Sequence, residues 1–91
     1  MASASPPPVR LVVPDLGMTG GTITLSLWLV PEGAAVLEGD RVAELLCGAA
    51  TLDLEAPVTG RLVRQLVDED DIVAPGTALA EFEAAAEGGE P

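Results

Sequence analysis

Few side chains in this sequence can do covalent or acid–base chemistry, and most of those that can are carboxylates. The 91 residues include 15 Asp and Glu, four Arg, a single cysteine, and neither His nor Lys. A nucleophile paired with a base, or a poised general acid, usually requires His, Lys or two carboxylates in a cleft. No such pair and no phosphate-binding glycine loop stands out. We therefore predict a domain that is not an enzyme and has no catalytic residues.

The densest run of carboxylates, Asp68-Glu69-Asp70-Asp71, is a candidate cation site. It lacks the alternating oxygen ligands and the central glycine of a calcium-binding loop. We expect a solvated turn at this run and no metal site.

Cys47 and Trp28 each allow a functional and a structural interpretation. A reactive thiol needs nearby cations or a helix N-terminus, and neither is close to Cys47 in the sequence. Tryptophan is common at interaction hot spots, but Trp28 is expected to pack in the core or at its rim. Because one cysteine cannot form an internal disulfide, the domain must rely on its core, which suits a reducing cytoplasm.

The balance of charge restricts the partners of the domain. A net charge of −11 repels nucleic acids and anionic membranes. No apolar run is long enough to span a bilayer, and residues 1–8 lack the features of a signal peptide. We predict a cytoplasmic monomer with no nucleic-acid and no membrane partner. Its acidic surface would either attract a basic protein or simply keep a small domain soluble.

Apolar residues recur at every second position, which is the period of a strand with one buried face. The clearest alternation has Ile23, Leu25, Leu27 and Leu29 on one face. Turn signals separate the short strands, at Glu32-Gly33, Glu38-Gly39-Asp40, residues 57–60 and Pro75-Gly76-Thr77. We predict an all-β sandwich or small barrel at residues 9–83, with a disordered proline-rich tail at 1–8 and a flexible acidic tail at 84–91.

An internal repeat divides the predicted domain into two similar halves. Residues 29–45, LVPEGAAVLEGDRVAEL, resemble residues 66–82, LVDEDDIVAPGTALAEF, at an offset of 37. The matched pairs are Leu29 and Leu66, Val30 and Val67, Glu32 and Glu69, Val36 and Val73, Gly39 and Gly76, Val42 and Leu79, and Glu44 and Glu81. Two such halves in one small β-domain predict quasi-twofold symmetry.

Between the halves, apolar strand residues flank the dipeptide Gly48-Ala49. A two-residue loop with glycine first is typical of a type II′ hairpin turn, because glycine tolerates a positive φ. We therefore expect a tight hairpin with Gly48-Ala49 at its exposed tip.

The order and spacing of these features resemble the biotinyl/lipoyl attachment domains, and in particular the lipoyl domains of 2-oxo acid dehydrogenase acyltransferases. The resemblance covers residues 11–83, with two additional residues between Ile23 and Trp28. It is carried by Pro14-Asp15-Leu16-Gly17, Gly21-Thr22-Ile23, Trp28-Leu29-Val30, Glu32-Gly33, Val36, Glu38-Gly39-Asp40, Val42, Glu44, Ala56-Pro57, Gly60, Leu66-Val67, Val73, Gly76 and Leu79. The resemblance implies a flattened barrel of two four-stranded antiparallel sheets with quasi-twofold symmetry.

The same resemblance implies a lysine at the hairpin tip, to which a ligase attaches lipoate or biotin through an amide. Alignment through Glu44 and Pro57 places that motif on Gly48, Ala49 and Ala50, with Ala49 in the position of the lysine. No shift of register supplies a lysine, since the chain has none. We therefore predict that the attachment hairpin is degenerate and that the domain carries no cofactor.

Two functional hypotheses follow. The domain is a non-acylated lipoyl-like module that binds protein, for example a basic surface of a 2-oxo acid dehydrogenase complex component. Alternatively, it is a lipoyl or biotinyl carrier whose attachment lysine has been replaced by Ala49. Gly48 also departs from the family motif, which favours natural divergence over a single engineered change.

Overall fold

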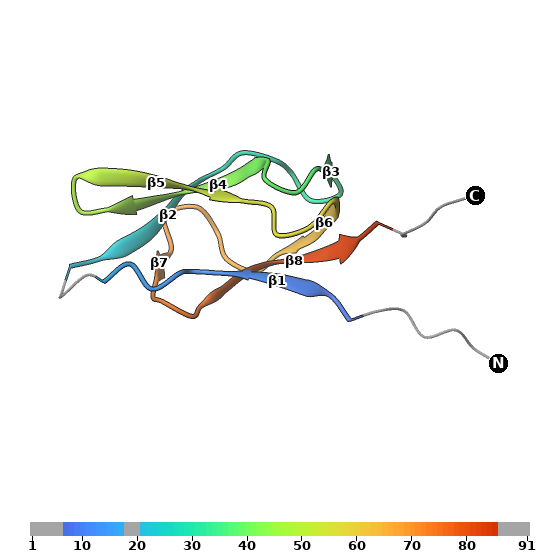
Figure 1. The fold of residues 1–91 in the computed structure, drawn as a ribbon. Coiled ribbons are helices and arrows are strands. Elements are labelled where there is room, and N and C mark those ends of the chain that lie inside the picture. The colour runs from blue at the N-terminus through green and yellow to red at the C-terminus, as the bar shows by residue number, and fades with distance from the viewer. Residues whose placement is uncertain (1–6, 18–20, 86–91) are drawn as a thin grey trace, which may run out of the picture.

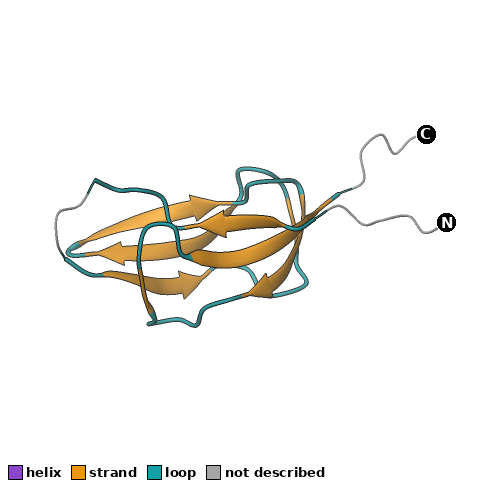
Figure 2. Ribbon diagram, turned by 90° about the horizontal axis from the view of Figure 1, so that it is seen from below, coloured by secondary structure: helices purple, strands orange, loops and turns teal. Residues whose placement is uncertain are grey.

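The computed structural model describes residues 7–17 and 21–85, and these residues form strands, turns and loops without a helix (Figures 1 and 2). The strands are β1 (Val9–Val12), β2 (Ile23–Trp28), β3 (Ala35–Val36), β4 (Arg41–Cys47), β5 (Ala50–Glu55), β6 (Gly60–Gln65), β7 (Ile72–Val73) and β8 (Ala78–Ala84). Most of the two predicted tails lies outside the described residues. Of the predicted C-terminal tail, the structure describes residues 84 and 85. Ala84 ends β8, and the N–H of Ala85 donates to the carbonyl of Thr59 at 2.8 Å.

The strands form two four-stranded antiparallel sheets that face each other (Figure 2). Sheet A has the strand order β1-β8-β6-β3, and sheet B has the order β5-β4-β2-β7. Each sheet combines strands from both halves of the sequence, so that neither half can complete a sheet alone. The predicted all-β architecture is confirmed.

The quasi-twofold symmetry extends to the residue-by-residue register of the strands. In sheet B, Leu25 pairs with Leu45 and Leu27 pairs with Glu44, which leaves Ser26 as a bulge. In sheet A, 37 residues later, Leu62 pairs with Phe82 and Arg64 pairs with Glu81, which leaves Val63 as the equivalent bulge. A bulge increases the local twist of a strand, so both sheets twist at the same place. The strand β1 occupies in sheet A the place that β5 occupies in sheet B.

The loops repeat as well, including one strained backbone position. The N–H of Gly33 donates to the carbonyl of Leu62, and the N–H of Asp70, 37 residues on, donates to the carbonyl of Leu25. Gly33 has a φ of 90° and Asp70 a φ of 76°. A positive φ is uncommon outside glycine, although aspartate tolerates it better than most residues. The repeated loop therefore explains the unusual backbone of Asp70.

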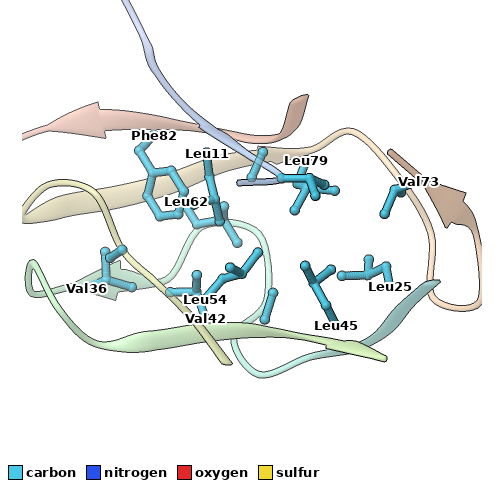
Figure 3. Packing of buried hydrophobic residues seen from close by; sticks show 14 of the residues in the cluster. Leu11, Leu25, Val36, Val42, Leu45, Leu54, Leu62, Val73, Leu79 and Phe82 are labelled. Carbon is cyan, nitrogen blue, oxygen red and sulfur yellow. The ribbon is translucent and has the colours of Figure 1, made fainter. Parts of the chain in front are cut away.

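The core between the sheets is aliphatic apart from Phe82, and side chains from both sheets point toward one another in it (Figure 3). Among the described residues, the buried apolar side chains other than Ile23 fall into equivalent pairs. The pairs are Leu11 and Leu54, Val13 and Ala56, Leu25 and Leu62, Val36 and Val73, Val42 and Leu79, Ala43 and Ala80, and Leu45 and Phe82. Burial of such side chains is the main favourable term in folding, and here the two halves share it.

At Gly60, one half of the fold lacks the core side chain that the other half supplies. The equivalent residue, Ile23, fills the interior and is 5% exposed. At Gly60, an added Cβ would overlap the backbone carbonyl of Glu83 and lie 2.9 Å from the nitrogen of Ala85. The missing side chain thus lets β6 approach the end of β8 closely.

We expect Gly60→Ala to lower the free energy of unfolding by about 2–3 kcal/mol, because backbone atoms cannot yield as a flexible side chain can. Urea unfolding followed by Trp28 fluorescence measures the loss. The control Thr59→Ala removes the hydroxyl that accepts from the N–H of Glu38, and it should cost only about 1 kcal/mol. Equal losses for the two variants would contradict the close approach at Gly60.

Candidate functional site

The hairpin between β4 and β5 has the tight turn that the sequence predicts. Cys47 pairs with Ala50, so only Gly48 and Ala49 lie in the turn. Gly48 has a φ of 65°, whereas Ala49 is not among the residues with positive φ. Positive φ at the first position alone distinguishes a type II′ turn from a type I′ turn. Gly48, Ala49 and Ala50 are all exposed.

The position of this hairpin in the fold makes it a protruding tip. It lies at one end of the sandwich, and the start of β1 and the end of β8 lie at the other end (Figure 1). The base of the hairpin is held by Leu45, which is fully buried and pairs with both Leu25 and Leu52. The tip is thus carried on a strand that is anchored in the core.

The side chains at the tip do not suit the amide attachment of a cofactor. Amide formation needs a nucleophilic amine, and Gly48, Ala49 and Ala50 offer no side-chain group beyond methyls. Cys47 is the nearest polarisable group. Its thiol is free and half-buried, and it packs against the core. The residues present at this tip therefore do not fit a lipoyl or biotinyl group.

Trp28 connects the two halves of the fold. Its indole N–H donates to the carbonyl of Val67 at 3.1 Å, and its backbone N–H donates to Oε2 of Glu69 at 2.9 Å. The equivalent residue, Gln65, repeats both contacts with Val30 and Glu32, at 3.0 and 2.7 Å. The packing role predicted for Trp28 is confirmed. The matching role of Gln65 was missed, although the offset of 37 residues points to it.

The acidic run forms the predicted turn. The N–H of Asp68 donates to Oδ2 of Asp71 at 2.9 Å, and all four residues are exposed. In the part of the chain that the structure describes, no group of three or more His, Cys, Asp or Glu is arranged to hold a metal ion.

Among the described residues, no helix is long and apolar enough to cross a membrane.

Two quasi-equivalent sheets with an exposed hairpin at one end are the features expected of a biotinyl/lipoyl attachment domain. A family model described as "Biotin-requiring enzyme" matches residues 9–82, and the chain belongs to this biotinyl/lipoyl family.

Curated relatives resemble the chain over a small part of their own length. The dihydrolipoyllysine-residue acetyltransferase component of the acetoin cleaving system of Bacillus subtilis is 34% identical over 71 residues, which are 78% of this chain and 18% of that protein. The pyruvate dehydrogenase E1 component subunit beta of Rhizobium meliloti is 38% identical over 60 residues, which are 66% of this chain and 13% of that protein. The chain thus corresponds to less than a fifth of either relative.

Two solved structures share the fold. A single-chain, multi-domain long-chain acyl-CoA carboxylase superposes with a TM-score of 0.72 and 25% identity, over 93% of this chain and 8% of that one. The lipoyl domain of the 2-oxoglutarate dehydrogenase complex from Azotobacter vinelandii superposes with a TM-score of 0.67 and 17% identity. That comparison covers 88% of this chain and all of the lipoyl domain, so the two chains share a fold.

The turn geometry predicts that substitutions at its two residues change the free energy of unfolding by different amounts. Gly48→Ala should lower the free energy of unfolding by about 1 kcal/mol, because an L-residue is strained at positive φ. Ala49→Lys should change it by less than about 0.5 kcal/mol, because residue 49 is exposed and its φ is ordinary. Urea denaturation measures both values. A larger loss for Ala49→Lys than for Gly48→Ala would contradict the type II′ turn.

Proposed function

We propose that this domain works without a covalently attached cofactor, as a protein-interaction module within or beside a complex of the 2-oxo acid dehydrogenase type. The observation that carries the proposal is Ala49 at the tip of the β4–β5 hairpin. The family resemblance assigns this position to the acylated lysine, and alanine has no atom to which an acyl group can be attached.

The preserved fold supports a retained function for the domain. The hairpin keeps its tight turn and its exposed tip, and among the described residues every buried apolar side chain except Ile23 has a buried equivalent in the other half. A domain that had merely lost its role would be free to lose these features. Without an acyl arm, the function left to such a domain is to bind other proteins through its surface.

Relatives and charge suggest the kind of partner. The relatives described above include an acetyltransferase component and an E1 component, each of which is named as part of a larger system. A net charge of −11 favours a basic protein surface through long-range attraction. The same charge opposes self-association, so we propose a monomer. The lone Cys47 cannot form an internal disulfide, in keeping with our proposal of a cytoplasmic location.

Intact-mass spectrometry tests the missing cofactor directly. The chain, co-expressed with a lipoate ligase and separately with a biotin ligase, should keep its unmodified mass in both cases. A genuine lipoyl domain and a genuine biotinyl carrier domain, expressed in the same cells, serve as the positive controls for the lipoate ligase and the biotin ligase. A mass increase of one lipoyl or biotinyl group on the native chain would overturn the proposal.

The second candidate function is that of a lipoyl or biotinyl carrier whose attachment lysine has been replaced by Ala49, and the exposed tight turn of the hairpin favours it. It predicts that Ala49→Lys restores acylation by one of the ligases. Because Gly48 also differs from the family motif, we expect little or no acylation of Ala49→Lys. The double variant Gly48→Asp/Ala49→Lys serves as a matched comparison. Full modification of Ala49→Lys in a folded protein would favour the carrier.

A direct binding measurement tests the proposed partner. The purified decarboxylase component of a 2-oxo acid dehydrogenase complex from the source organism is titrated with the chain by calorimetry. We expect binding that weakens as the salt rises from about 50 to about 300 mM, because charge attraction between exposed groups is screened. Absence of binding at the lower salt concentration would count against this class of partner.

A further inference from the structure

The outer faces of the two sheets differ in chemistry although their backbones are equivalent. Sheet B exposes Ile72, Leu46 and Leu27, with exposed fractions of 75%, 39% and 41%. The equivalent positions of sheet A hold Ala35, Glu83 and Arg64. Large aliphatic side chains are therefore not a requirement of the fold at these positions. Exposed aliphatic groups that gather on one face of a small domain commonly mark an interaction site.

Strand register places these aliphatic residues on the same outer face, in two adjacent rows of sheet B. Thr24 pairs with Leu46 on one side and with Ile72 on the other, so a single row crosses β4, β2 and β7. Directly opposed residues of antiparallel strands project from the same face of the sheet. Leu27 belongs to the next outward-facing row, where it pairs with Glu44. We call Leu27, Leu46, Ile72 and the central Thr24 the aliphatic stripe.

Carboxylates border the aliphatic stripe. Glu44 pairs with both Leu27 and Asp53, and Asp71 directly precedes Ile72 in the chain. Arg41 is the basic residue on this face, and it lies 3.6 Å from Asp53 in an ion pair.

The outer face of sheet A has a different balance of charge. It carries Arg10, Arg61 and Arg64, and the register places these residues opposite Glu81 and Glu83. Arg10 forms an ion pair with Glu81 at 3.4 Å. The strands of sheet A also expose the smaller aliphatic residues Val12 and Val63, at 43% and 45%. The acidic character is thus stronger on the outer face of sheet B, which exposes the larger Leu and Ile side chains.

We propose that the aliphatic stripe is the docking surface for the partner, a protein surface with aliphatic side chains at its centre and Lys or Arg around them. This inference rests on the proposed interaction function and gives it a location. The acidic border favours such a basic partner over a second copy of the chain, because two copies would bring like charges together. The same border opposes an anionic membrane.

A designed peptide can probe the stripe directly. The probe is an amphipathic helical peptide of about 18 residues, with Leu along one face and Arg on the other. A scrambled peptide of the same composition keeps the charge but has no apolar face. In NMR titrations of the isotope-labelled chain, the amphipathic peptide should bind about fivefold more tightly or better. The largest amide shift changes should fall on residues 24, 27, 46 and 72.

Two surface variants provide the matched comparison. Ile72→Ser removes the most exposed member of the stripe and should weaken binding of the peptide about fivefold or more. Leu37→Ser removes an aliphatic side chain of similar exposure, 64%, from the loop after β3 at the other end of the sandwich (Figure 1). Binding by Leu37→Ser should remain unchanged. Both substitutions lie at exposed positions, so thermal unfolding should show that each variant is folded.

Three results would overturn the docking surface: equal binding of the two peptides, equal effects of the two variants, or amide shifts confined to sheet A. Concentration-dependent dimerisation in analytical ultracentrifugation that Ile72→Ser abolishes would assign the stripe to self-association instead. Failure of the proposed function has a different signature, because an acylated native chain would be seen by mass spectrometry whatever the peptide titrations show.

Discussion

The structure depends on the burial of paired aliphatic side chains between two sheets that neither half of the chain can build alone. Leu25 and Leu62, and Leu45 and Phe82, occupy equivalent places and are fully buried. Because β2 and β4 pair in one sheet while β6 and β8 pair in the other, the core closes only when both halves are present. The paired bulges at Ser26 and Val63 give both sheets the same local twist, so that they can face each other across this interior.

The two halves of the fold are nearly symmetric, so positions where equivalent residues differ are the candidates for a functional role. The tight turn at Gly48-Ala49 connects β4 to β5. The matching strands, β8 and β1, are the last and the first strand of the described chain, and no turn connects them. The outer face of sheet B carries Leu46 and Ile72 where sheet A carries Glu83 and Ala35. Packing constrains buried positions strongly and exposed positions weakly, which leaves the outer faces and the tip free to specialise.

The hairpin tip keeps a tight turn although its residues offer no amine for amide attachment. A type II′ turn needs glycine or a similar residue at its first position, and it places no demand on the chemistry of the second side chain beyond a negative φ. Ala49 meets that demand as well as lysine would. The turn geometry and the attachment chemistry are therefore separable, which is why the family relationship of the chain does not by itself imply an acyl group.

The sequence alone determined the offset of 37 residues and the turn at Gly48-Ala49, because each is a local property of side-chain polarity or backbone freedom. The strand period held only up to the bulge: Leu27 and Leu29, predicted to share a face with the buried Ile23 and Leu25, are 41% and 42% exposed because the extra residue Ser26 reverses the alternation. The proposal that the tip carries no amide-linked arm also comes from the sequence, since the absence of lysine is a matter of composition. Only the tertiary structure decided that Leu46, Thr24 and Ile72 form one row, because strand order and register bring together residues that are far apart in the chain. The matching roles of Trp28 and Gln65 also became visible only there, since their hydrogen bonds cross between the halves.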